Sequence, residues 1–272
     1  MQEIIKVEHL TKSYGKRIAA DNINLSVPRG TVFGLLGANG AGKSTTMECI
    51  LGTKKADGGK VSVLGMNPLT DRRQLFEKVG VQFQEASYPD KITVSELCEV
   101  TASLYRQTAC PDELLDRFGI GGCKKSLVKD LSGGQRQRLF IVLALIPDPE
   151  VVFLDELTTG LDAKARRDVW KILFALKEKG VTILLTSHFM DEVEVLCDRI
   201  CILRKGNIVF SGTVSEAVKN SSCDKFEDAY LWYAEREEEI VPAGNGYVHI
   251  CDLYALDCTY HSWGNIWKQA GL

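Results

Sequence analysis

The sequence has little that would place the chain inside a membrane or on a nucleic acid. The longest uninterrupted apolar run that we find, Leu139 to Ile146, is far shorter than the roughly 20 residues of a membrane-spanning helix. The lysines and arginines are scattered and the net charge is -3, so no basic field is available for nucleic acid. We therefore expect no direct membrane insertion and no nucleic-acid partner.

Disulfide bonds are not expected either. The 9 cysteines are an odd number, and most of them, such as Cys49, Cys98, Cys197 and Cys201, sit singly within apolar stretches. This placement is typical of reduced core residues and not of a disulfide framework. The N-terminal sequence MQEIIKVEHL also lacks the layout of a secretory signal, so we expect the chain to work in the cytoplasm.

The composition is that of a globular protein, and the hydrophobic pattern predicts an α/β fold. The 272 residues suffice for one large domain, or for a domain with an appendage. Alternating residues predict strands over 3–10 and 23–27, which would form a small antiparallel layer. Apolar strands at 151–154 and 181–185 flank a helix at 163–179, and this βαβ order predicts a parallel sheet.

Further elements are expected around this sheet. The pattern predicts short strands over 60–64 and 79–83, a mainly helical insertion over 93–118 and a hairpin over 200–210. From residue 224 the sequence becomes acidic and then aromatic, so we treat 224–272 as an appendage of unknown role.

A glycine-rich loop follows the apolar segment that ends at Leu36. It matches the phosphate-binding pattern G-x-x-x-x-G-K-[ST] without a mismatch. Its glycines let backbone N–H groups converge on phosphate oxygens, its lysine would neutralise the β- and γ-phosphates, and its serine would reach Mg²⁺. The loop alone does not separate an ATPase from a GTPase or a kinase. The residues expected to bind nucleotide here are Gly37, Asn39, Gly40, Gly42, Lys43, Ser44 and Thr45.

Two carboxylates end the apolar strand at 151–154. Asp155 is predicted to hold Mg²⁺, and Glu156 is predicted to face the γ-phosphate and polarise the attacking water. By itself the pair could also be a solvated acidic strand end, but Lys43 earlier in the chain favours the catalytic interpretation.

A second candidate anion site occurs in the segment LSGGQ. Ser132 is a good helix N-cap, and the two glycines after it expose backbone N–H groups, whereas one nucleotide does not need two such helix ends. At this point the sequence resembles the ATP-binding cassette (ABC) family, in which LSGGQ is the signature motif. The resemblance implies that this motif contacts the γ-phosphate of ATP held by another subunit. The residues involved are Ser132, Gly133, Gly134 and Gln135.

The same resemblance, which covers roughly residues 3 to 220, assigns further roles. Tyr14 matches the aromatic that stacks on adenine, and His188 matches the histidine that contacts the γ-phosphate. Gln84 matches the glutamine that touches Mg²⁺ and the attacking water, although Gln82 is a competing choice of register. Asp162 matches the loop that crosses the dimer interface.

The resemblance also implies an architecture for the whole chain. It is a P-loop NTPase core with a mainly parallel sheet, an N-terminal antiparallel layer and an inserted helical subdomain at about 85–140. The nucleotide-binding domain is expected to span 1–223. One departure occurs where the family has Asp-Glu-Pro-Thr, because this chain has Leu157 after Glu156; the change restores a backbone N–H and relaxes φ.

Two segments, VGVQFQEASYPDKITVSELCEVTASLYR and TSHFMDEVEVLCDRICILRKGNIVFSGT, look like those of ATPase subunits of ABC-2-type exporters. The resemblance implies ATP and Mg²⁺ as ligands, a second cassette chain as partner, and a separate membrane permease that holds the chain at the inner face of the cell membrane. The alternative is a soluble cassette ATPase of iron–sulfur cluster assembly. The cargo, and whether the dimer is homo- or heteromeric, are not readable from this chain.

Overall fold

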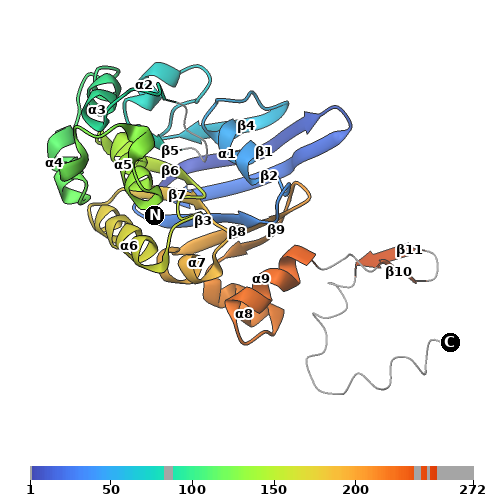
Figure 1. The fold of residues 1–272 in the computed structure, drawn as a ribbon. Coiled ribbons are helices and arrows are strands. Elements are labelled where there is room, and N and C mark those ends of the chain that lie inside the picture. The colour runs from blue at the N-terminus through green and yellow to red at the C-terminus, as the bar shows by residue number, and fades with distance from the viewer. Residues whose placement is uncertain (1, 83–87, 236–239, 244–245, 250–272) are drawn as a thin grey trace. The chain divides into compact units, whose positions relative to one another are not determined.

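The structure is a computed structural model that describes residues 2–82, 88–235, 240–243 and 246–249 (Figure 1). These residues fall into two compact units, Met1–Ala234 and Glu235–Leu272. The first unit holds every candidate site residue that the structure describes. Within the second, β10 (Ile240–Ala243) and β11 (Gly246–His249) pair antiparallel.

The first unit is built on a central sheet with strand order β5-β6-β7-β3-β8-β9. The neighbouring pairs from β5 to β8 are parallel, and β9 is antiparallel to β8. This order confirms the predicted parallel sheet and the predicted C-terminal hairpin. In sheet order, the strands are Val79–Gln82 (β5), Val151–Asp155 (β6), Thr182–Thr186 (β7), Val32–Gly37 (β3), Arg199–Arg204 (β8) and Asn207–Gly212 (β9).

A separate antiparallel layer has the order β2-β1-β4. The pairing of β1 with β2 confirms the predicted layer, and β4 adds a strand that was not assigned to it. Alternation within the buried strands explains how the two layers meet. In β6, Val151 and Phe153 belong to the core shared with the antiparallel layer, whereas Val152 and Leu154 belong to the core beneath the helices. The layer comprises Glu3–Tyr14 (β1), Arg17–Pro28 (β2) and Gly58–Val63 (β4).

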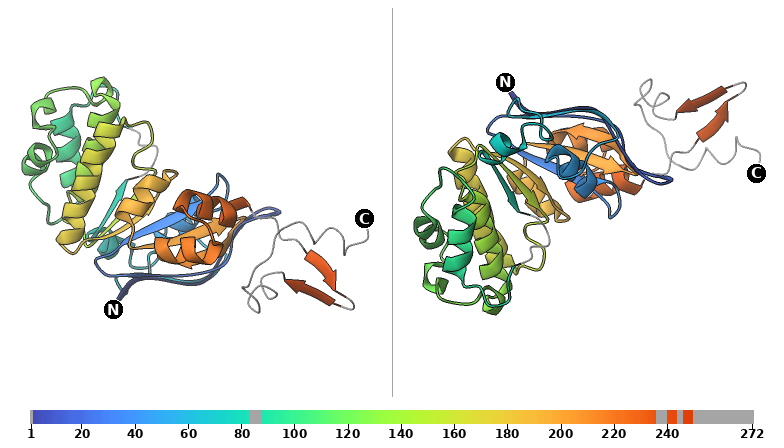
Figure 2. Two further views of the ribbon diagram at one scale, coloured as in Figure 1. Left: turned by 90° about the horizontal axis from the view of Figure 1, so that it is seen from below. Right: turned by 90° about the horizontal axis from the view of Figure 1, so that it is seen from above.

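A helical lobe lies on the side of the central sheet away from the antiparallel layer (Figure 2). It occupies the predicted insertion, between β5 and β6 in the chain. It comprises Val94–Ala102 (α3), Pro111–Arg117 (α4), the short 3-10 turns Gly121–Cys123 (η1) and Val128–Asp130 (η2), and Gly133–Leu145 (α5).

Of the other helices, four connect strands of the central sheet and of the antiparallel layer, and the last two follow β9. None of the helices among the described residues is both long and apolar enough to cross a bilayer. They are Lys43–Ile50 (α1), Arg72–Phe76 (α2), Ala163–Glu178 (α6), Met190–Leu196 (α7), Val214–Ser221 (α8) and Phe226–Glu235 (α9).

The first unit extends past residue 223, where the sequence predicted the nucleotide-binding domain to end. Helix α9 buries Phe226, Ala229 and Tyr233 in a core that also contains Phe210 of β9. The rings of Phe210 and Tyr233 have centroids 4.9 Å apart. This apolar face explains why α9 belongs to the first unit despite its acidic composition.

Candidate nucleotide-binding site

The glycine-rich loop joins the end of β3 to the start of α1, and its glycines are sterically required. A Cβ on Gly37 would lie 2.4 Å from the carbonyl oxygen of Leu203, and one on Gly42 would lie 2.1 Å from that of Ala19. Both residues also have positive φ, at 148° and 106°. A side chain at either position would therefore displace neighbouring backbone as well as strain its own. The backbone of this loop is held in place by β2 and β8.

Lys43 begins α1 and turns its ammonium group back over the loop. Its Nζ donates to the carbonyl oxygen of Gly37 at 2.7 Å and to that of Ala38 at 3.3 Å, and the residue is only 5% exposed. Burial lowers the pKa of Lys43 below its ordinary value, while the nearby Glu156 and Asp155 act in the opposite direction. A buried cation beside a glycine loop at a helix N-terminus is suited to binding a phosphate anion.

The two predicted carboxylates lie at the end of β6, beside the end of β7. Asp155 Oδ1 accepts a hydrogen bond from Thr186 Oγ1 at 2.5 Å, and Thr186 Oγ1 accepts one from the backbone N–H of Glu156 at 3.0 Å. Thr186 therefore ties both acidic residues to the neighbouring strand. Burial raises the pKa of the Asp155 carboxyl above its ordinary value, and the hydrogen bond from Thr186 acts against this shift.

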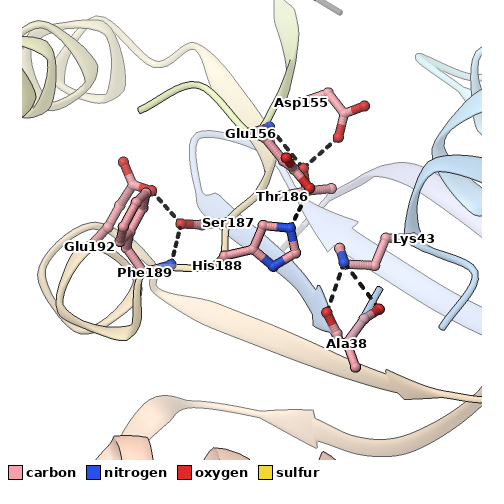
Figure 3. A network of polar contacts seen from close by, with 10 residues as sticks. Ala38, Lys43, Asp155, Glu156, Thr186, Ser187, His188, Phe189 and Glu192 are labelled. Carbon is pink, nitrogen blue, oxygen red and sulfur yellow. Dashed lines mark hydrogen bonds and ion pairs between the residues drawn. The ribbon is translucent and has the colours of Figure 1, made fainter. Parts of the chain in front are cut away.

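Glu156 is presented on an unusual backbone. Its φ is 50°, in the left-handed region that few non-glycine residues adopt. The next residue, Leu157, replaces the family's proline and is 2% exposed within the helical core. The carboxylate of Glu156 contacts Nε2 of His188, and Figure 3 shows this pair facing the same space as Lys43.

Nine of the predicted residues line one hollow of about 640 Å³, a volume within the usual range of ligand pockets. The hollow also contains Arg17 and Ala19, which sequence reasoning did not find. The guanidinium of Arg17 donates to the carbonyl oxygen of Gly40 at 2.9 Å, so β2 contributes a cation to the glycine loop. The predicted lining residues are Tyr14, Asn39, Gly40, Gly42, Lys43, Ser44, Thr45, Glu156 and His188.

The aromatic ring of Tyr14 is held at the rim of this hollow, where it is 44% exposed. The ammonium groups of Lys12 and Lys54 lie 5.5 Å and 5.6 Å from its centroid. These are cation–π distances, and such contacts orient a ring without covering it completely. Tyr14 is therefore placed where a flat ligand ring could stack on it.

The segment LSGGQ starts α5, and none of its residues lines that hollow. Ser132 caps the helix as predicted: its Oγ accepts from the backbone N–H of Gln135 at 3.3 Å, and Gln135 Oε1 accepts from the backbone N–H of Ser132 at 2.9 Å. A Cβ on Gly134 would lie 3.3 Å from the Cβ of Ala165. The start of α5 thus packs closely against the start of α6.

Asp162 has a structural contact within the chain. It caps α6, because its Oδ1 accepts from the backbone N–H of Ala165 at 2.7 Å. Gln84, the third predicted catalytic residue and a predicted Mg²⁺ ligand, lies outside the described residues. Its competitor in register, Gln82, is 4% exposed at the end of β5.

The geometry defines a class of protein: an α/β cassette with a phosphate loop, an acidic strand end and a separate capped helix start that carries LSGGQ. A profile of the ABC transporter family matches residues 20–159. The chain belongs to this family.

Characterised relatives agree with this assignment. The chain is 37% identical over 217 residues to the daunorubicin/doxorubicin resistance ATP-binding protein DrrA of Streptomyces peucetius, covering 78% of this chain and 66% of that protein. It is 37% identical over 230 residues to the Nod factor export ATP-binding protein I of Ralstonia nicotianae, covering 82% of this chain and 72% of that protein. A dimeric structure of a bacterial ABC transporter cassette matches with a TM-score of 0.69 at 25% identity, covering 77% of this chain and 98% of that chain.

Proposed function

We propose that the chain is the ATP-hydrolysing subunit of an ABC-2-type exporter, which closes head to tail on a second cassette and drives a separate permease. The observation that carries the proposal is the separation of the two helix starts. The start of α1 lies in the hollow with Glu156 and His188, whereas Ser132 does not line that hollow. The names of the relatives, which refer to drug resistance and to Nod factor export, support export over iron–sulfur assembly.

The residues of the hollow divide the work on ATP. Tyr14 stacks on the adenine, and Lys43 together with the loop N–H groups binds the β- and γ-phosphates. Glu156 accepts a proton from the attacking water, and His188 contacts the γ-phosphate, consistent with their mutual contact. Thr186 holds the carboxylate of Asp155 at the end of β6.

The residues beside the phosphate loop fit Mg²⁺. The hydroxyl of Ser44 and the carboxylate of Asp155 supply the hard oxygen atoms that this cation prefers, and Gln84 is proposed as a third ligand. Among the described residues no group of three or more His, Cys, Asp or Glu side chains could hold a metal ion. Mg²⁺ binds through one or two carboxylates together with substrate phosphates and water, and it would neutralise charge on the phosphates.

The capped start of α5 would meet the triphosphate of a second chain. Ser132 and Gln135 satisfy each other's backbone groups, so this helix start is stable before any partner arrives. Its first-turn N–H groups then complete the site that the second chain's glycine loop provides. Asp162, which caps the neighbouring helix, would lie at the same interface.

The permease is proposed to dock on the helical lobe, beside the segment from Gln84 to Tyr88. Tyr88 packs on the lobe, with its ring centroid 6.1 Å from that of Phe140. Nearby in the chain, Val100 and Leu104 are 54% and 73% exposed, although both are apolar. The chain would then sit on the cytoplasmic face of the membrane through this partner.

The test of hydrolysis is Glu156→Gln, which keeps the size of the side chain and removes the base. We expect the ATP dissociation constant to stay within about threefold of wild type and phosphate release to fall by about a hundredfold or more. An ATP-bound dimer should accumulate in size-exclusion chromatography. Phosphate release at the wild-type rate would remove Glu156 from the proposed role.

The test of the partner is Leu104→Glu, with Leu231→Glu as the matched control. Leu231 is also an exposed leucine, at 42%, but lies on α9. We expect Leu104→Glu to reduce co-purification with the proposed permease while leaving the ATPase activity of the isolated subunit unchanged. Equal co-purification of both variants would contradict docking at this surface, and recovery of a soluble scaffold instead would favour the iron–sulfur alternative.

A further inference from the structure

A buried carboxylate lies next to the segments that carry Glu156 and His188, and none of the motifs accounts for it. Glu192, in the first turn of α7, is 2% exposed. Burying a carboxylate is costly unless its oxygen atoms receive hydrogen bonds or a cation. In the described part of the chain, no lysine or arginine forms an ion pair with Glu192. The compensation comes mainly from hydrogen-bond donors, with a smaller Coulombic contribution from Arg166.

Three donors from three different segments converge on this carboxylate. Ser187 Oγ and Thr158 Oγ1 both donate to Oε2, the latter at 3.1 Å, and Trp170 Nε1 donates to Oε1 at 3.1 Å. Thr158 and Ser187 are themselves only 1% and 2% exposed. Burial raises the pKa of Glu192, and the hydrogen bonds from Ser187, Trp170 and Thr158 act in the opposite direction. Glu192, Thr158 and Ser187 are therefore buried together, and Trp170 is partly buried beside them.

The two hydroxyl donors, Ser187 and Thr158, lie close in the sequence to the two proposed catalytic residues. Thr158 lies two residues after Glu156, and Ser187 lies immediately before His188. Ser187 Oγ also accepts from the backbone N–H of Phe189 at 3.0 Å, which brackets His188 on both sides (Figure 3). Glu192 Oε2 therefore joins the segment that presents Glu156 to the segment that presents His188.

We propose that Glu192 is a positioning residue for ATP hydrolysis: it fixes the Glu156 and His188 segments relative to each other without touching the nucleotide. This rests on the proposed roles of Glu156 and His188. Because the side-chain hydrogen bonds of Glu192 lead to Ser187, Thr158 and Trp170 and not to the glycine loop, Glu192 acts on turnover and not on ATP binding. The hydrogen bond from Trp170 attaches the carboxylate to α6, so the Glu156 and His188 segments are both held in position relative to this helix.

The test compares Glu192→Ala with Glu194→Gln in the full chain, measuring kcat, KM for Mg-ATP and thermal stability. Glu194 lies on the same helix and is exposed, so its substitution changes a carboxylate without touching the cluster. We expect Glu192→Ala to lower kcat by about ten- to a hundredfold with KM within about threefold, because small displacements of catalytic groups are costly. Glu192→Gln can still accept from Ser187 and Thr158 through its amide oxygen, although its NH2 group cannot accept from Trp170, so it should recover part of kcat. Glu194→Gln should match wild type.

A purely structural role would give a different result. A folded Glu192→Ala protein with a lower melting temperature but unchanged kcat would overturn the proposal, and so would a loss confined to KM. A Glu156→Gln protein measured alongside separates the two ideas: if it retains wild-type turnover, the proposed role of Glu156 fails whatever Glu192 does.

Smaller changes keep the test open if Glu192→Ala does not fold. Ser187→Ala and Thr158→Val each remove one hydroxyl donor and should lower kcat by about three- to tenfold at unchanged KM. The Ser187→Ala/Thr158→Val double variant should lose little more kcat than the more impaired single variant, because each substitution breaks the same Thr158–Glu192–Ser187 connection. Independent, multiplying effects on kcat would show that Ser187 does not act through Glu192.

Discussion

Helices α1 and α5 both begin at glycine-rich segments that could bind an anion, yet they begin in different ways. Gly42 starts α1 in a left-handed conformation with no side-chain cap, whereas Ser132 starts α5 with a reciprocal capping box. The first N–H groups of any helix lack partners within the helix. In α1 no side chain caps these N–H groups, so they are available to a ligand in the hollow. In α5 one of them, the N–H of Gln135, already donates to the side chain of Ser132.

This difference indicates that the two helix starts have different roles in binding a triphosphate. The start of α1 lies in the hollow with Lys43 and Glu156, so we propose that it binds a triphosphate within one chain. The start of α5 is stabilised by its capping box, but none of the LSGGQ residues lines that hollow. Such a helix start is folded in the single chain and could bind a ligand that is held by another chain.

The largest expected effect concerns the two glycines that shape these starts. Gly42→Ala should weaken ATP binding by about a hundredfold or more and lower the free energy of unfolding by about 2 kcal/mol, because φ is 106° and the new Cβ meets backbone at 2.1 Å. Gly134→Ala meets only a side-chain carbon, at 3.3 Å, and should cost less than about 1 kcal/mol. Calorimetric titration and thermal unfolding measure both effects, and equal losses would contradict the contrast.

The next effect separates binding from turnover. Lys43→Ala should weaken ATP binding by about 30- to 100-fold, since it removes a charge-assisted hydrogen bond to phosphate. Ser132→Arg should leave the ATP affinity of the monomer within about twofold of wild type and abolish hydrolysis by crowding the second chain's phosphate site. Fluorescent-nucleotide binding and phosphate release distinguish the two. A Ser132→Arg monomer that cannot bind ATP would show that the two helix starts serve one site within one chain.

A smaller effect tests the cap itself. Ser132→Ala removes the capping hydrogen bond and should cost about 1 kcal/mol, or about 2–4 °C in melting temperature. Thr213→Ala is the matched control, because Thr213 forms the same capping box with Glu216 at the start of α8. Both variants should lose similar stability, but only Ser132→Ala should also slow hydrolysis. If neither variant changes hydrolysis, the start of α5 has a structural role alone.

The smallest effect is on the pH dependence of stability. The pKa of Asp155 is raised by burial, so its charged form is disfavoured in the folded chain at neutral pH. Asp155→Asn should therefore raise the melting temperature of the nucleotide-free chain at pH 7. The gain should shrink as the pH falls through the raised folded value toward the ordinary value of 3.8, because wild-type Asp155 becomes protonated. A gain that grows toward acid pH would contradict the sign of this shift.

Local patterns were enough to predict much of this molecule. The glycine loop, the acidic strand end and the cap at Ser132 each depend on neighbours in the chain, and the structure shows the expected helices and strands around them. Glycine spacing, strand endings and N-cap chemistry are short-range signals, so they can be read without knowledge of the tertiary fold.

The residues that sequence reasoning missed depend on contacts between distant segments. Arg17 reaches the glycine loop from β2, and Glu192 joins hydroxyls that lie 34 and 5 residues away in the chain. Neither contact follows from a motif. The extent of the first unit was a different case: Phe226, Ala229 and Tyr233 have helical spacing, and this apolar face could have predicted that α9 packs on the domain.

The measurement that tests the account most directly is complementation between Lys43→Ala and Ser132→Arg chains. Each protein alone should be inactive. In a mixed head-to-tail dimer, one site carries both changes, while the other combines an intact Lys43 with an intact Ser132. Random pairing should therefore restore about a quarter of the wild-type phosphate release, because about half of the dimers are mixed and each holds one intact site. If mixed dimers form, as shown by differential tagging and co-purification, and no activity returns, the two helix starts do not share a composite site.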